Sequence, residues 1–256
     1  MEPPTLDPDL PTGSIPLPTD RDLPSDDAGR EGAAPIVLPT GADLPYDDGE
    51  PMESPWHRDN MMLLLDSINT HWRDRTDFYA GGNMFVYFST ERVFGRDFRG
   101  PDFFVVKGVE RHRPRVSWVV WDEGGKRPDL IVELLSPTTA GIDRGVKKVL
   151  YESVFRTHEY FTYDPLADRL DGWRLATGAG YEPIAPDGAG RVWSRQLDLA
   201  LGTWDGTYNH TQARWLRMFD AAGTVVPTGQ ETVEGENARL RRELDALRAQ
   251  VPPPAP

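Results

Sequence analysis

The run Asp129-Leu-Ile-Val-Glu-Leu-Leu135 is the most hydrophobic strand-like segment of the sequence, and it carries an acid near its centre. Successive side chains of a strand point to opposite faces, so Glu133 shares a face with Ile131 and Leu135. A carboxylate at such a position is costly to bury unless it is paired with a cation or binds a metal ion. The run therefore predicts a buried strand that also holds an ion pair or a functional site.

The segments around this run alternate between helical and strand-like patterns. The expected elements are, in order, a helix over 57–72, strands at 83–89, 102–107, 116–121 and 129–135, a helix over 144–157, strands at 159–163 and 169–175, and weaker strands to about 219. On the second helix we expect Val146, Leu150 and Val154 to share one face, with Asp143 as the N-cap. This order predicts an α/β or α+β fold with a mixed central sheet flanked by helices.

A second acid, Asp102, opens the apolar run 102–107. Two carboxylates on neighbouring strands suit a hard cation such as Mg²⁺ or Mn²⁺, because these ions prefer oxygen ligands. Such an ion activates water and neutralises charge during phosphodiester hydrolysis. That chemistry also uses a cation near the scissile phosphate, and Lys147 or Lys148 on the following helix can supply it.

Composition excludes several classes of protein. The chain has 256 residues and no cysteine, which excludes a disulfide scaffold and thiolate metal sites. Its apolar runs are far shorter than the roughly 18 residues of a membrane span. The N-terminus lacks the basic and apolar segments of a signal peptide, so we expect a cytoplasmic protein without a membrane partner. The sequence contains no phosphate-binding Gly-rich loop, serine nucleophile elbow or His-Glu-x-x-His zinc motif.

The two ends of the chain differ in composition from its middle. Residues 1–50 hold nine Asp and three Glu against two Arg, which is −10 of the net charge of −13. Residues 1–42 also hold nine Pro and no aromatic residue, so we expect a disordered acidic tail ahead of a globular domain over 43–225. Residues 231–250 predict a terminal helix, with a short coiled coil and hence a homodimer indicated by the heptad spacing of Asn237, Leu240, Leu244, Leu247 and Val251.

Polar groups outside the two strands offer weaker candidates. The densest basic cluster, Arg111, Arg113 and Arg115, lies in a loop between two expected strands. Arginine there can contact the phosphates of nucleic acid, and a solvated loop is the alternative. Ser136, in the turn that leaves the Glu133 strand, can likewise touch phosphate or bond within its own turn. The near-neutral charge outside the tail gives nucleic-acid binding no support of its own.

Several short motifs occur in a recognisable order. They are Pro101-Asp102, Pro128-Asp129-Leu-Ile-Val-Glu133-Leu-Leu-Ser136-Pro-Thr-Thr, Asp143-Arg-Gly-Val-Lys147-Lys-Val-Leu-Tyr151 and His158-Glu-Tyr-Phe-Thr-Tyr-Asp164-Pro165. In this order and spacing they resemble the Uma-type "putative restriction endonucleases" of the PD-(D/E)xK nuclease superfamily, over most of 44–250. The resemblance implies a restriction-endonuclease-like core of α-β-β-β-α-β order, a metal-dependent endonuclease activity, and DNA as the expected nucleic-acid substrate.

The resemblance also assigns roles to individual residues. Asp102 matches the first metal ligand and Glu133 the second, so both are expected to bind Mg²⁺ or Mn²⁺. Leu135 occupies the place of the motif's lysine, and in this family a lysine on the following helix, here Lys147, replaces it as the third catalytic group. Asp129 fits the family pattern too. It lies roughly 13 Å along the strand from Glu133, so we expect it to support the strand entry or the ligands.

Two other functions remain compatible with these residues. A nuclease fold that has lost its activity would serve as an interaction module that self-associates through residues 231–250, and Leu135 together with the acidic balance favours it. A purely structural domain would satisfy its acids with Arg or Lys. The carboxylates of Asp102 and Glu133 lying close together, with the Lys147 amine directed at them, would favour the enzyme.

Overall fold

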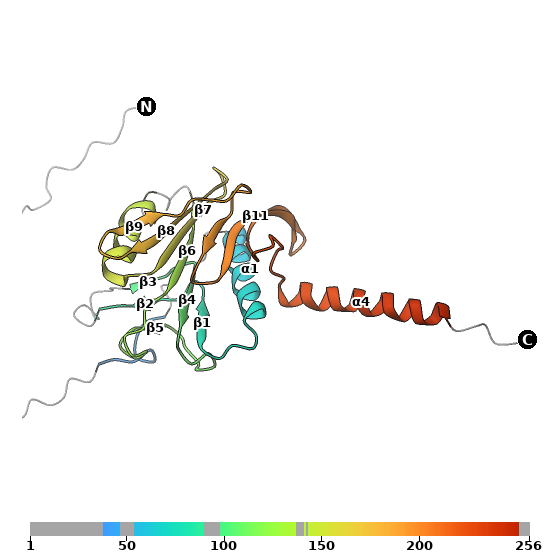
Figure 1. Cartoon of the computed structure of the whole chain (residues 1–256). Coiled ribbons are helices and arrows are strands. Elements are labelled where there is room, and N and C mark those ends of the chain that lie inside the picture. Colours follow the sequence, from blue (N-terminus) through green and yellow to red (C-terminus); the bar gives the residue numbers. More distant parts are fainter. Residues whose placement is uncertain (1–37, 47–53, 90–97, 137–140, 142, 251–256) are drawn as a thin grey trace, which may run out of the picture. The chain divides into compact units, whose positions relative to one another are not determined.

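The computed structural model describes residues 38–46, 54–89, 98–136, 141 and 143–250. A six-stranded mixed sheet lies at its centre, with β6 and β7 parallel and all other neighbours antiparallel. Its strands in spatial order are β1 (Phe78–Gly81), β4 (Phe103–Lys107), β6 (Leu130–Leu134), β7 (Glu159–Asp164), β8 (Arg169–Ala176) and β9 (Gly180–Pro183) (Figure 1). The mixed sheet with flanking helices confirms the expected α+β class.

One face of this sheet packs on α1 (Pro55–His71) and on a second sheet of β10 (Val192–Ser194), β11 (Leu199–Tyr208) and β12 (Thr211–Phe219). Helix α1 begins where the sequence favours it, because Ser54 accepts a hydrogen bond from the His57 N–H and Pro55 occupies the first turn. The buried side chains of this face include Leu64, Ile68, Phe103, Val105, Val132, Phe161, Leu201 and Leu216. The predicted helix over 57–72 is confirmed.

The opposite face packs on two smaller units. One is a three-stranded sheet of β2 (Val86–Tyr87), β3 (Phe98–Arg99) and β5 (Trp118–Val119). The other is a continuous helix made of η2 (Asp143–Lys147), α3 (Lys148–Leu150) and η3 (Tyr151–Phe155), named helix 143–155 below. The buried residues of this face include Phe104, Val106, Ile131, Tyr151, Phe155 and Tyr160.

The face that helix 143–155 buries differs from the predicted one. Val146 and Val154 are exposed, at 67% and 43%, and the side chains turned to the sheet include Asp143, Tyr151 and Phe155. Positions 143, 147, 151 and 155 repeat every four residues, and in an α-helix each such step would drift about 40° around the axis. The π-helical turns of η2 and η3 hold more residues per turn, which brings the four-residue repeat back onto one line.

The order of the elements matches the core that the sequence resemblance implied. Along the chain, α1, β1, β4, β6, helix 143–155 and β7 follow one another, with the small strands β2, β3 and β5 inserted between them. Most predicted strands are confirmed, including β4, β6, β7 and β8. The expected strand at 83–89 shrinks to β2, and β1 has no counterpart among the predictions, because its four residues are too few for a visible alternation.

The segment ahead of α1 is part of the described domain. Most of the acidic tail expected over 1–42 lies outside the described residues. Residues 38–46 pack on the domain, since the Trp121 indole donates to the carbonyl of Pro39 at 2.8 Å and the Tyr87 hydroxyl donates to that of Pro45. The described domain therefore includes residues ahead of position 43.

Helix α4 (Gly229–Gln250) follows the second sheet and covers the predicted helix at 231–250. Its first turn is fixed to the domain. Thr228 and Glu231 form a reciprocal capping box, and the Glu231 carboxylate also pairs with the buried guanidinium of Arg217 at 2.7 Å. From Val233 to Gln250 every residue is exposed, so the rest of the helix has no packing partner among the described residues.

Candidate active site

Asp102 and Glu133 face each other across the β4–β6 pair. In this antiparallel register Phe103 lies opposite Val132, so the next residue outward, Asp102, lies opposite Glu133 and on the same face. The Leu134 N–H donates to Asp102 Oδ2 at 2.7 Å, which fixes the aspartate at the edge of the strand pair. The two acids singled out from the sequence are therefore neighbours in space.

Helix 143–155 places three more side chains against this acid pair. The Lys147 amine lies 3.2 Å from Glu133 Oε2 and 2.7 Å from Asp143 Oδ1, so it bridges two carboxylates. The Tyr151 hydroxyl donates to Glu133 Oε1 at 2.8 Å. Because 143, 147 and 151 align on the buried side of the helix, one helix supplies an acid, a cation and a phenol to a single strand carboxylate.

Burial and charge shift the protonation equilibria of this cluster. Glu133 is 1% exposed, and its burial, reinforced by the nearby charges of Asp102 and Asp143, raises its pKa to about 8 despite the opposing effects of Lys147 and Tyr151. Burial alone would lower the pKa of Lys147, but the carboxylates of Glu133 and Asp143 outweigh it and raise that pKa. At neutral pH the lysine is therefore charged, and Glu133 holds a proton in a large fraction of molecules.

The carboxylates of this cluster can be compared with what a hard cation such as Mg²⁺ requires of its ligands. Within the described ranges, no group of three or more His, Cys, Asp or Glu side chains is arranged to enclose a metal ion. Mg²⁺ does not need such an enclosure, because it usually keeps water and takes one or two carboxylates together with substrate phosphate. Two adjacent carboxylates, Asp102 and Glu133, with the Lys147 side chain 22% exposed beside them, fit that mode of binding.

The other candidates near the site lie apart from the acid pair. Asp129, at the opposite end of β6, accepts from the Lys107 N–H at 2.7 Å and contacts the His158 ring at 3.1 Å. The Lys148 amine lies over the Trp173 ring, 4.4 Å from its centroid. Ser136 is half-buried just beyond the end of β6, and its turn partners 137–139 lie outside the described residues. Of the two helix lysines, Lys147 alone pairs with Glu133 and Asp143.

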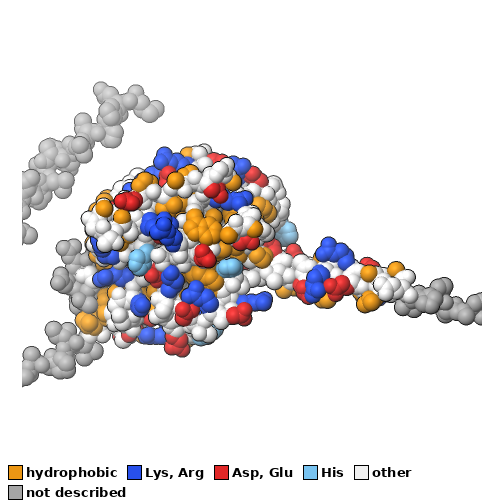
Figure 2. Space-filling model, in the orientation of Figure 1, with side chains coloured by type: hydrophobic (Ala, Val, Ile, Leu, Met, Phe, Trp, Pro, Cys, Tyr) orange, Lys and Arg blue, Asp and Glu red, His pale blue; other side chains and the backbone are white. Residues whose placement is uncertain are grey.

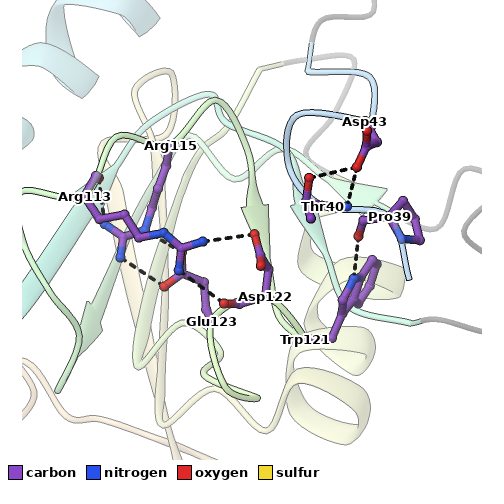
Figure 3. Close-up of polar contacts among 8 residues, drawn as sticks. All are labelled: Pro39, Thr40, Asp43, Arg113, Arg115, Trp121, Asp122 and Glu123. Atoms are coloured by element: carbon purple, nitrogen blue, oxygen red, sulfur yellow. Dashed lines mark hydrogen bonds and ion pairs between the residues drawn. The ribbon is translucent and has the colours of Figure 1, made fainter. Parts of the chain in front are cut away.

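The three loop arginines are paired within the protein. Arg111 donates to carbonyls at the end of α1, including those of Trp72 and Arg75 at 2.9 Å. Arg113 pairs with Asp122, and Arg115 pairs with Glu123 at 2.7 Å. Figure 3 shows both arginines beside these acids. The Arg115 side chain is only 3% exposed. Contact of these residues with nucleic acid stays a prediction, and it would have to compete with partners already in place.

Asp143 and Tyr151 belong to the cluster although neither was predicted as a site residue. Asp143 was expected as a helix cap, yet its side chain is buried and paired with Lys147. The Tyr151 hydroxyl was not among the predicted site groups. The available signal was the four-residue spacing of Asp143, Lys147 and Tyr151, which places three polar groups on one side of a helix.

Comparison with known proteins places the chain in a family. The family model described as Uma2, "Putative restriction endonuclease", matches residues 35–209, so the chain belongs to that family. The chain is also similar to a crystal structure described as a "putative nuclease" from Anabaena variabilis. Identity is 17%, the match covers 59% of this chain and 81% of the other, and the TM-score is 0.43. None of the curated proteins matches the chain significantly.

Family membership supports a nuclease, with nucleic acid as the class of substrate. Over the described part of the chain, none of the helices combines the length and the apolar character needed to span a bilayer.

Proposed function

We propose that this chain is a metal-dependent endonuclease that hydrolyses phosphodiester bonds of DNA. One observation carries the proposal: the Lys147 amine, from a helix, reaches the carboxylate of Glu133 directly beside Asp102. An isolated structural ion pair would need one acid and one base. Here three acids share a single lysine, and burial together with the charges of Asp102 and Asp143 raises the pKa of Glu133 to about 8. A site that concentrates negative charge in this way is suited to a divalent cation.

Asp102 and Glu133 would hold Mg²⁺ or Mn²⁺. When bound, such an ion lowers the pKa of water and neutralises charge on the phosphate. Glu133 must lose its proton to act as a ligand, so binding of the ion and deprotonation of this residue are coupled. Tyr151 fixes the orientation of the Glu133 carboxylate through its hydroxyl, and the Leu134 N–H does the same for Asp102.

Lys147 acts as a cation and not as a general base, because its raised pKa keeps it protonated at neutral pH. It is placed to hold the scissile phosphate and to stabilise the negative charge that develops there. In the reaction a water oxygen bonds to phosphorus, the phosphorus–oxygen ester bond breaks, and the leaving oxygen takes a proton. The proton of the attacking water passes to solvent.

The test compares wild type with Glu133→Gln, Lys147→Met and the control Lys148→Met. Lys148→Met removes the same charge from the same helix but leaves the acid pair untouched. Mg²⁺ and Mn²⁺ are titrated by calorimetry, and cleavage of single- and double-stranded DNA and of RNA is followed with each ion. We expect Glu133→Gln to lose metal binding, and Lys147→Met to lose about 100-fold or more in cleavage rate while it still binds metal. Lys148→Met should retain both activities.

Other outcomes would point away from DNA hydrolysis. Cleavage of RNA alone would change the substrate and keep the site. Failure of wild type to bind either ion would contradict the proposal and leave an inactive nuclease fold that serves as an interaction module. Equal losses in Lys147→Met and Lys148→Met would show that the general charge of the helix matters and not the contact with Glu133.

A further inference from the structure

Helix α4 presents an apolar stripe with nothing packed on it among the described residues. Its side chains are Val233, Leu240, Leu244 and Leu247, which are 46–60% exposed. Together with Asn237 they follow alternating steps of four and three residues, the seam of a coiled coil. Figure 2 shows both charged and hydrophobic side chains on the surface of this helix. An apolar seam exposed to water is unfavourable on a helix that stands alone. The seam therefore indicates that a partner helix covers it.

The charges beside the seam identify that partner. In the heptad that places Leu240 and Leu247 at position d, Asn237 and Leu244 are at position a. Glu236 and Glu243 then take both flanking g positions, and Arg241 and Arg248 take the e positions that follow them. In a parallel pair each g residue meets the e residue five positions later on the other helix, so Glu236 meets Arg241 and Glu243 meets Arg248.

The antiparallel arrangement of the same helices is disfavoured by charge. There, g residues face g residues and e residues face e residues, which would bring Glu against Glu and Arg against Arg. In the single chain Arg239, at position c outside the seam, donates hydrogen bonds to both Glu236 and Glu243. Arg239 is exposed to solvent, so the two glutamates can leave it and pair with a second helix without leaving a buried charge unpaired.

Asn237 limits the number of helices in the bundle. A single Asn at an a position favours a two-stranded coil and one register, since its amide meets the amide of its counterpart. We propose that α4 forms a parallel two-stranded coiled coil with α4 of a second copy of this chain. The seam, the e and g charges and the single Asn are complementary to an identical helix. The Glu231–Arg217 pair fixes the first turn of α4 to the domain. A parallel coil would therefore place the two domains of the dimer at the same end of the coil.

Charge reversal of the full chain tests the pairing. One variant carries Glu236→Arg and Glu243→Arg, a second carries Arg241→Glu and Arg248→Glu, and a control carries Arg242→Glu and Asp245→Arg on the outer face. Light scattering after size exclusion gives the mass. We expect wild type and control at twice the mass of one chain, each reversed variant at half that value, and the mixture of the two reversed variants restored to the double mass.

Cross-linking tests orientation and register, and the absence of cysteine in the natural chain makes it clean. Asn237→Cys should form an interchain disulfide on mild oxidation, because equivalent a positions touch only in a parallel, in-register pair. Arg242→Cys, on the outer face, should not. A wild type that stays monomeric, a mixture that does not recover the double mass, or equal cross-linking of the two cysteine variants would each overturn the proposal. None of these readouts depends on nuclease activity, so the result stands apart from the proposed function.

Discussion

Glu133 and Glu159 are two buried glutamates on the neighbouring parallel strands β6 and β7, and their carboxylates have opposite kinds of neighbours. Glu159 is fully buried, pairs with Arg174 at 2.7 Å, and accepts hydrogen bonds from the Ser194 hydroxyl and two backbone N–H groups. Glu133 has one hydroxyl and one shared lysine, and it faces two further carboxylates.

The partners of the two glutamates separate a structural acid from an acid of the candidate site. Glu159 points to the α1 side of the sheet and ties β7 to β10, and its partners are donors throughout. Such a complete set of donors offsets the cost of burying its charge. Glu133 points to the opposite face, where its own charge is disfavoured. Both residues are buried, so burial does not distinguish them. The groups that surround each carboxylate identify the one that belongs to the candidate site.

The largest expected effect is on stability at Glu159. Glu159→Gln replaces an acceptor oxygen by an amide that points donors at other donors and leaves Arg174 without a counter-charge, so it should lower the free energy of unfolding by about 3–5 kcal/mol. Glu133→Gln should not lower it at neutral pH, because Glu133 must take up a proton on folding at that pH and glutamine need not. Urea denaturation of both variants measures the contrast. Similar losses of stability in the two variants would contradict this distinction.

The next effect is the pH dependence of stability that Glu133 causes. The pKa of Glu133 rises from 4.5 to about 8 on folding, so between these values the folded chain binds more protons than the unfolded chain. Stability from this residue is therefore complete below pH 4.5 and is lost as pH rises through 8. At about 1.4 kcal/mol per pKa unit, wild type should lose a few kcal/mol relative to Glu133→Gln across that window. The free energy of unfolding of wild type and Glu133→Gln is measured against pH without metal. Curves that run parallel would contradict the raised pKa of Glu133.

The smallest expected effect concerns the hydroxyl of Tyr151. Tyr151→Phe removes a hydrogen bond to Glu133 and should lower stability by about 1 kcal/mol. That bond holds the pKa of Glu133 down, so its loss should move the pH midpoint of the previous experiment upward. Tyr160→Phe is the matched control, since its hydroxyl donates to the carbonyl of Asp143 and not to Glu133. A midpoint displaced equally by both variants would argue against a specific role for Tyr151.

The sequence predicted the acid pair and missed much of what surrounds it. Asp102 and Glu133 were accessible because a strand alternates every two residues and both acids interrupt apolar runs. Asp143 was not, because an acid at the start of a helix has the pattern of a cap whether or not it turns inward. The exposure of Val146 and Val154 escaped prediction because a regular 3.6-residue turn was assumed. The partners of Arg113 and Arg115 come from a turn at 122–123 whose proximity only tertiary packing decides.

The π-helical turns of helix 143–155 make the site sensitive to chain length more than to chain composition. Asp143, Lys147 and Tyr151 face the sheet because a fixed number of residues separates them within an underwound helix. Removal of one residue between 147 and 151 would let the helix relax to regular winding, and it would turn the two ends of the cluster about 100° apart around the axis. Substitutions at the exposed Val146 or Val149 leave that count unchanged. Substitutions on the outer surface of this helix should therefore leave the cluster intact, whereas an insertion or deletion within it should move the lysine away from the acid pair.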